Sequence, residues 1–418
     1  MSDRRRAGVR RVIVGLDFGT HSTKCVIRPH GSESVAVICF AERDQALGYP
    51  WFTEPSLVRI TDENLYFGRA ALNVSGGPLF RSLKMQLLPE TLVRADYPEF
   101  PRGTSPDILI ACFISRVLRL IRRSVETAYG DRTKILLNMA APMDHFENEA
   151  LKTRYLQIIH AAWESVFGDE QFTVRNRVGL SEACSYFKHR LQNRVAASEE
   201  RVYDVLPETV APIVSLSLDP RMVPGFYLML DMGAGTSEFS INRVNERGAD
   251  QKVVCYFDQT QRIGGDDFEA VEQRFRDDRE SRIADLVERV AKYVQETCFF
   301  GFDKDKGNRW MSQQWRNIHL LLTGGAARRS DVEAAVRSVL PVKPHLPGES
   351  SFTASWHEPS LGGTKLDLTP GELSLLAVSH GLSIHRRQWP TVFEPQSVEQ
   401  RARPEIMDRP VGYWYVDT

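Results

Sequence analysis

The sequence lacks several patterns that would place it in a common class of protein. Its six cysteines are far apart and include no C-x-x-C pair, which argues against a zinc site or a disulfide framework. No stretch approaches the roughly 18 consecutive apolar residues that a membrane-spanning helix needs. The apolar run after the basic N-terminus is too soon broken, by Asp17, to be a signal peptide. We therefore expect a cytoplasmic protein with no membrane partner.

The sequence also lacks a charge excess and two familiar phosphate-binding motifs. Its formal net charge is only −1, so we expect no direct binding to nucleic acid. Neither the P-loop G-x-x-x-x-G-K-[ST] nor a strand-linked G-x-G-x-x-G occurs. What is present is a chain of 418 residues, of which 42% are hydrophobic. That length allows two or more domains, each with a sizeable core.

The chain is organised around residues 12–27, VIVGLDFGTHSTKCVI. An apolar run ends at Asp17, Gly19 and Thr20 open a turn, and a second apolar run begins at Cys25. This pattern predicts a β-hairpin with a polar tip. Glycine in the tip lets backbone N–H groups approach a phosphate, and a carboxylate at the end of the strand can hold a hydrated Mg²⁺.

The same pattern returns in residues 227–241, YLMLDMGAGTSEFSI. Asp231 follows the apolar run, and residues 233–236 form the turn. Because Asp-x-Gly stands at the same place in both copies, the chain is predicted to consist of two related halves that face one nucleotide. A third turn, Gly324–Gly325, follows the buried strand predicted at 318–322. Each turn alone is weak evidence, because Asp-x-Gly turns are common, but their order and spacing are more specific.

At this point a resemblance to a known family becomes visible. The chain resembles the actin-like ATPase superfamily, and within it the nucleotide-binding domain of the seventy-kilodalton heat-shock chaperones. The motifs that carry the likeness, over about residues 11–386, are LDFGTHST, LFRSLK, SEACSYF, LDMGAGTSEFSI, IGGDDFE, LLLTGGAARR and GELSLLAVSHGLS. The resemblance implies an α/β fold of two lobes, that is, duplicated ribonuclease-H-like halves around a nucleotide cleft.

The resemblance also implies roles for individual residues, with ATP and Mg²⁺ as ligands. The implied catalytic residues are Lys84, Glu182, Asp231 and Thr236. Asp17 and Asp231 would hold Mg²⁺ through water. The implied nucleotide contacts are Asp17, Gly19, Thr20, His21, Lys24, Gly233, Ala234, Gly235, Gly265, Gly324, Gly325 and Arg328. His21 stands where the chaperones have Thr, and Lys24 matches the phosphate-contacting lysine of actin in spacing but also fits an ordinary surface lysine.

These motifs divide the chain into segments. The predicted segments are a basic leader (1–10), a first lobe (11–194), a connection or insertion (195–225), a second lobe (226–386) and a C-terminal tail (387–418). Two connecting helices, near Glu182 and near Leu373, are expected to join the lobes. The stretch between Asp267 and Ile318 is too short for the extra lobe of the chaperones, and nothing after Ile384 resembles their peptide-binding domain.

Four functions remain open from the sequence. The first is an ATPase that acts as a nucleotide-dependent switch on a separate partner protein, and the alternative next to it is an actin-like ATPase that forms filaments. A small-molecule kinase is disfavoured because no sugar-binding signature is evident. A pseudo-ATPase that only binds nucleotide is disfavoured because Lys84, Glu182 and both aspartates are present together.

Overall fold

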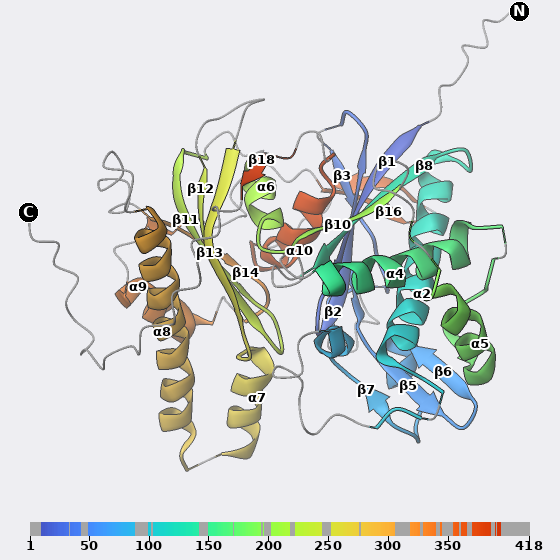
Figure 1. Ribbon diagram of the computed structural model, residues 1–418, viewed down its shortest axis with the longest axis horizontal. Helices are drawn as coiled ribbons and strands as arrows, with labels where there is room; N and C mark the ends of the chain where they lie inside the picture. The colour runs from blue at the N-terminus through green and yellow to red at the C-terminus, as the bar shows by residue number, and fades with distance from the viewer. Residues whose placement is uncertain are drawn as a thin grey trace, which may run out of the picture.

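The protein is an α/β protein with mixed sheets, as the computed structural model in Figure 1 shows. The structure describes residues 10–32, 34–42, 49–87, 99–101, 103–141, 149–169, 171–193, 195, 202–217, 222–244, 252–275, 277–305, 318–326, 329–339, 343–344, 354–358, 361–365, 370–385, 389 and 391–393.

The first half of the molecule is built on an eight-stranded sheet. Its strand order is β10-β8-β1-β2-β3-β16-β17, with β4 paired to β2. The strands are β1 (Arg11–Phe18), β2 (Ser22–Pro29), β3 (Val35–Val37), β4 (Thr53–Pro55), β8 (Lys134–Ala141), β10 (Tyr203–Pro207), β16 (Ala354–Glu358) and β17 (Leu361–Lys365). β1 is buried along nearly its whole length, which explains its continuous apolar sequence.

The second half is built on a six-stranded sheet of the order β15-β14-β11-β12-β13-β18. Its strands are β11 (Gly225–Met232), β12 (Ser237–Val244), β13 (Lys252–Gln261), β14 (His319–Thr323), β15 (Lys343–Pro344) and β18 (Thr391–Phe393). Five strands of each sheet repeat one arrangement, β10-β8-β1-β2-β3 in the first and β15-β14-β11-β12-β13 in the second. In both sets the first two pairs of neighbouring strands are parallel and the last two pairs are antiparallel. The sequence prediction of two related halves is confirmed to this extent.

A small antiparallel sheet extends the first half. It consists of β5 (Val58–Thr61), β6 (Asn64–Phe67), β7 (Leu79–Phe80) and β9 (Arg177–Gly179), in the order β7-β5-β6-β9. Its inward side chains, among them Val58 and Phe67, join the main apolar core of the first half, and a separate core fills the second half.

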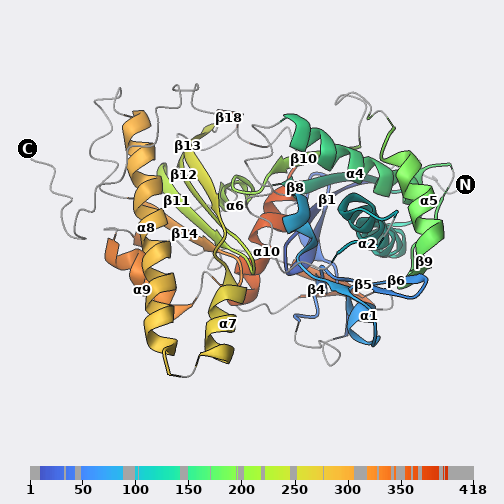
Figure 2. The same ribbon diagram turned by 60° about the horizontal axis from the view of Figure 1, so that its bottom comes forward.

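The helices lie over the sheets and between them (Figures 1 and 2). They are α1 (Arg69–Leu72), the 3-10 helix η2 (Leu83–Leu87), α2 (Pro106–Tyr129), α4 (Glu149–Phe167), α5 (Leu180–Arg190), α6 (Ala211–Ser217), α7 (Gly265–Arg274), α8 (Arg279–Asp305), α9 (Ser330–Val339) and α10 (Pro370–Leu382). Ser105 caps α2 by accepting a hydrogen bond from the Ile108 N–H, and Pro106 begins the helix. Among the described helices, none is both long and apolar enough to cross a membrane.

The structure changes the description of two predicted segments. Within 195–225, β10 pairs with β8 and is part of the first sheet, which excludes an insertion, whereas α6 packs between the halves as a helix-containing connection would. The predicted tail is not simply an appendage after residue 387. Trp389 packs against the cores around α6 and α10, and β18 pairs in parallel with β13 in the second sheet. Proline and short strand length hid both elements from the sequence pattern.

Candidate functional site

Two hairpin turns, one from each half, build the centre of the site. In the first, Asp17 on β1 lies opposite Lys24 on β2, and the Lys24 ammonium donates to Asp17 Oδ2 at 2.6 Å. In the second, Asp231 on β11 lies opposite Glu238 on β12. Residues directly opposite in an antiparallel pair point to the same face, so each hairpin presents two charged groups beside its turn. The predicted hairpins are confirmed.

The two turns open onto one pocket of about 360 Å³ that both halves line. The sequence-predicted residues that line it are Asp17, Gly19, Thr20, His21, Lys24, Lys84, Asp231, Gly233, Ala234, Thr236, Gly265, Gly324 and Gly325. The predicted set is therefore largely brought together, although its members come from opposite ends of the chain.

Gly235 is close to the pocket but does not line it. A Cβ placed on Gly235 would lie 3.1 Å from the Thr20 methyl group and 3.6 Å from the Met85 sulfur. The turn of the second half therefore packs directly on the first half, and glycine is what allows this close approach.

Lys84 lies on η2 and forms a buried ion pair with Glu208, which directly follows β10. Burial opposes the positive charge of Lys84, but Glu208, Glu238 and Asp17 outweigh it and raise the pKa of Lys84. The ammonium group therefore stays charged among these carboxylates. Lys84 is only 4% exposed, so it is not the solvated surface lysine that most lysines are.

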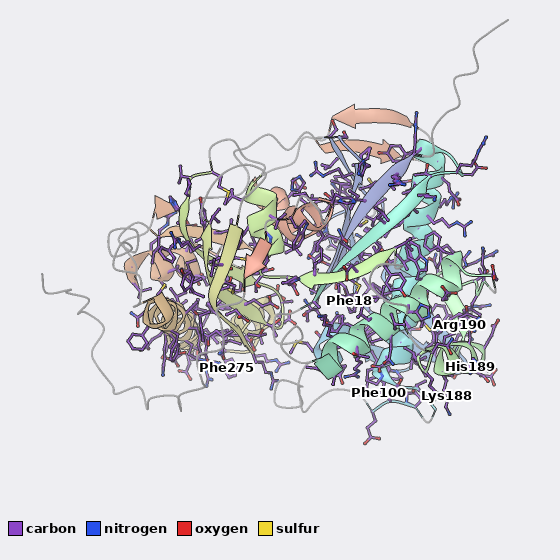
Figure 3. The ribbon with its side chains drawn as sticks, turned by 45° about the horizontal axis from the view of Figure 1, so that its top comes forward. Phe18, Phe100, Lys188, His189, Arg190 and Phe275 are labelled. Atoms are coloured by element: carbon purple, nitrogen blue, oxygen red, sulfur yellow. The ribbon has the colours of Figure 1, made fainter. Side chains whose placement is uncertain are left out.

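The structure does not place Glu182 in the predicted site. Glu182 is exposed in the first turn of α5, and it is not among the residues that line the pocket. Figure 3 labels the last turn of the same helix at Lys188, His189 and Arg190, at the outer edge of the first half. Glu208, unlike Glu182, lines the pocket.

Sequence reasoning missed Glu208 and Glu238. Glu208 ends the alternating run of β10 and precedes α6, so it had the same signal as Asp17 and Asp231, a carboxylate at the end of a strand. The neighbouring prolines made that strand hard to recognise. Glu238 had a clear signal in the sequence, because it follows Asp231 by the same number of residues as Lys24 follows Asp17, and each pair lies opposite across its hairpin.

The pocket carries an excess of buried negative charge. Its carboxylates Asp17, Glu208, Asp231 and Glu238 face the ammonium groups of Lys24 and Lys84. Burial, Glu208 and Asp17 raise the pKa of Asp231 to about 7. Within the described residues, Asp17 Oδ1 is buried without a hydrogen-bond partner. Such a site fits a bound cation, which would balance the excess charge.

Across the described segments, no three His, Cys, Asp or Glu side chains are grouped so that they could hold one metal ion. The prediction that Asp17 and Asp231 hold Mg²⁺ through water stays a prediction.

Gly324 closes the pocket floor against Asp231. Its backbone φ of +79° is one that residues with a side chain rarely adopt, and an added Cβ would lie 2.5 Å from Asp231 Oδ1. The glycine is required both by its backbone conformation and by the room that the Asp231 carboxylate needs.

The far end of the pocket is lined by Ala326, Arg329 and one side of α10. Arg329 is held by Asp331 at 2.8 Å and Glu272 at 2.9 Å, and its guanidinium lies 4.5 Å from the centre of the Phe268 ring. Arg328, the predicted nucleoside contact, lies outside the described residues.

His21 of the first turn also lines the pocket. Its ring stacks on Tyr49 with the ring centres 4.6 Å apart, and burial lowers its pKa. A neutral imidazole therefore stands at this position of the phosphate turn.

Comparison of the chain with known proteins adds no family assignment: no protein-family model matches it, and no curated protein matches it.

Proposed function

We propose that the pocket binds ATP with Mg²⁺ and hydrolyses it, and that the chain has the two-lobed, actin-like ATPase fold. The observation that carries the proposal is the convergence of two Asp-x-Gly turns, the Lys84–Glu208 ion pair and the Gly324–Gly325 turn on one pocket. The repeated strand order of the two sheets supports the fold assignment.

The charges of the pocket suit phosphoryl transfer to water. This reaction depends mainly on positioning and on neutralising the phosphate oxygens. Lys84 and Lys24 would stabilise the negative charge of the terminal phosphate, and the turn N–H groups of Gly19 and Gly233 would hold the phosphate chain. Asp17 and Asp231 are the residues that would hold a hydrated Mg²⁺, which supplies further neutralisation of the phosphates when bound.

The attacking water must lose a proton, and the site contains a suitable acceptor. Asp231 lines the pocket, and burial together with the charges of Glu208 and Asp17 raises the pKa of its carboxyl group, so this carboxylate is the proposed proton acceptor. Glu208 orients Lys84 through their ion pair and shares in positioning the water.

The far end of the pocket suits a base. The Arg329 side chain pairs with the carboxylates of Glu272 and Asp331 and lies over the Phe268 ring, so its charge is largely neutralised while the side chain still lines the pocket. A planar base can stack on such a group. Arg329, next to the predicted Arg328, is thus the described candidate for this contact.

The proposed role of the ATPase is a nucleotide-dependent switch on a separate protein. Both halves line the pocket and touch each other through Gly235 and Thr20, so a triphosphate that contacts both would favour the closed arrangement. A second polypeptide would then respond to the difference between the open and the closed form.

The experiment that tests the proposed activity is phosphate release from ATP by the purified full chain, with Mg²⁺ and with EDTA. The proposal requires turnover that depends on Mg²⁺ and that is lost in Lys84→Ala. Equal phosphate release by the parent and Lys84→Ala would contradict it.

A further inference from the structure

Helix α6 packs on the sheet of the second half, and helix α10 packs on the sheet of the first half. Ile213 and Leu216 of α6 pack against side chains of β11 and β14 in the second sheet. Leu376 of α10 packs against side chains of β2 and β3 in the first sheet, and Gly15 of β1 lies against the α10 backbone at Ser379. A contact between α6 and α10 is therefore a contact between the two halves.

Where the two helices cross, the backbone of α10 at Gly381 lies directly against the backbone of α6 at Ala211. A Cβ added to Gly381 of α10 would lie 1.8 Å from the carbonyl oxygen of Ala211 in α6. No side chain fits at this position, so glycine is what allows the two helix backbones to approach each other so closely. In Figures 1 and 2 both helices lie in the middle of the molecule, between the sheets.

A buried chain of hydrogen bonds runs through this crossing. His380 of α10 bonds through Nδ1 to Ser215 Oγ of α6 at 2.7 Å and through Nε2 to Arg28 Nη2 of β2 at 2.8 Å. Arg28 also donates through Nε to Ser383 Oγ at 3.3 Å. His380, Ser215 and Arg28 are each less than one-tenth exposed.

The chemistry of Arg28 fixes the proton on His380. A guanidinium can only donate, so Nε2 of His380 must accept from Arg28 and carry no proton. In a neutral ring the proton is then on Nδ1, which donates to Ser215 Oγ. Burial and the Arg28 charge both lower the pKa of His380, which keeps the ring neutral. Each donor in the chain therefore points the same way: Arg28 of the first sheet donates to His380, and His380 donates to Ser215 of α6.

The same helix α10 reaches the nucleotide pocket. Ser374, Leu375 and Val378 line the pocket, and His380 lies about 7.5 Å further along the helix axis than Leu375, at roughly 1.5 Å per residue. Neither His380 nor Ser215 lines the pocket. A movement of α10 at the nucleotide is therefore carried to the crossing by a single rigid helix.

We propose that the Arg28–His380–Ser215 chain is the pivot on which the two halves move, and that it sets the rate at which the cleft opens and releases nucleotide. The proposal rests on the function proposed above. The Ser215–His380 bond joins α6, which packs on the second sheet, to α10, which packs on the first. The bonds from Arg28 to His380 and Ser383 instead join β2 to α10 and to the residue that follows it, all on the side of the first sheet. Loss of the first bond frees the halves to move, and loss of the others does not.

Ser215→Ala and Ser383→Ala are a matched pair that tests this difference. Each removes one buried hydroxyl from the same network, but only Ser215 lies across the crossing. The measurement is the dissociation rate of a fluorescent ADP analogue from the full chain, chased with unlabelled ADP in a stopped-flow instrument. Ser215→Ala should release the analogue about tenfold faster than the parent, and Ser383→Ala at the parent rate.

His380→Gln is the second variant, in case Ser215→Ala does not fold. The glutamine amide oxygen can still accept from Arg28 while the link to Ser215 is lost, so the same acceleration is expected. Thermal unfolding of all variants reports the purely structural effect, which should be similar for both alanine variants.

Equal release rates in Ser215→Ala, His380→Gln and Ser383→Ala would overturn the pivot and leave the proposed function standing. Failure of the parent protein to bind the analogue would overturn the proposed function itself, and the pivot with it.

Discussion

The ammonium group of Lys84 forms a buried ion pair with the carboxylate of Glu208, although more than a hundred residues separate them in the chain. The pair joins η2 to the end of β10 and stands between the carboxylates of the two hairpins. Since removal of one partner leaves the other charge buried and alone, the pair is costly to break, by about 3–5 kcal/mol.

Hydrolysis should therefore depend on Glu208 and not on Glu182. We expect Glu208→Gln to slow phosphate release by on the order of 10²-fold while ATP stays bound, because the carboxylate acts mainly in the transition state. Glu182→Ala is the control, since it removes an exposed carboxyl group of α5. Single-turnover kinetics with the full chain measures both. Slow phosphate release by Glu182→Ala together with parent-like release by Glu208→Gln would contradict the role proposed for Glu208.

The raised pKa of Asp231 predicts a pH-dependent stability. The folded protein holds a proton on Asp231 up to pH about 7, and the unfolded chain only up to about 3.8. The stability contributed by this proton is complete below pH 3.8 and is lost as the pH rises through 7. In EDTA without nucleotide, the free energy of unfolding of the parent should rise relative to Asp231→Asn as the pH falls from 8 to 5, by about 1.4 kcal/mol per unit below pH 7.

Urea unfolding of the two proteins at a series of pH values measures this difference. The full span between the two pKa values corresponds to about 4 kcal/mol. Glu182→Gln, which also replaces one carboxyl by an amide, controls for the change of residue type. If the difference in the free energy of unfolding between the parent and Asp231→Asn stays constant across this pH range, Asp231 is not held among like charges.

Arg329 should contribute to the binding of the base and not of the phosphates. Its hydrogen-bond donors are engaged by Glu272 and Asp331, and one face of its guanidinium lies over the Phe268 ring, while the side chain lines the pocket. We expect Arg329→Ala to weaken ATP binding about tenfold and to leave the affinity for inorganic triphosphate unchanged. Arg337→Ala, which removes an arginine paired on the surface of α9, is the control. Equal losses for ATP and triphosphate would place Arg329 at the phosphates.

The C-terminal tail, with Trp414 and Tyr415, is one candidate docking element for the proposed partner protein. Since β18 pairs with β13 in the second sheet, a deletion that tests the tail must begin after residue 393. Removal of residues 395–418 should leave ATP hydrolysis unchanged and abolish capture of the partner in a pull-down. Retention of the partner by the shortened chain would show that it binds elsewhere.

The sequence predicted the two hairpins well, because each combines an apolar run, a carboxylate and a glycine turn within a short segment. The sequence also predicted that Lys84 belongs to the site, although this prediction came from a resemblance and not from any local pattern. The structure was needed to show that η2 buries this lysine beside Glu208. No spacing rule relates the two residues, since the contact is created by the packing of distant segments.

The error at Glu182 has a similar physical origin. Strand β9 followed by α5 resembles the expected connecting segment in its local pattern, and that pattern is indeed a strand and a helix. What decides the role of a helix is the sheet on which it packs. β9 belongs to the small sheet, whereas β10 before Glu208 belongs to the eight-stranded sheet that carries Asp17.

The measurement that tests the central proposal most directly is calorimetric titration of Mg-ATP into the parent, Gly324→Ala and Gly31→Ala. Gly324 and Gly31 have nearly equal φ values of +79° and +78°, so both alanine substitutions impose the same backbone strain. Only at Gly324 does the new Cβ meet Asp231, at 2.5 Å, while Gly31 has nothing within 4 Å. Because both variants place a side chain at a positive φ and only Gly324→Ala crowds the Asp231 carboxylate, the account predicts that the parent and Gly31→Ala bind Mg-ATP and that Gly324→Ala does not. Binding of equal strength by all three proteins would contradict it.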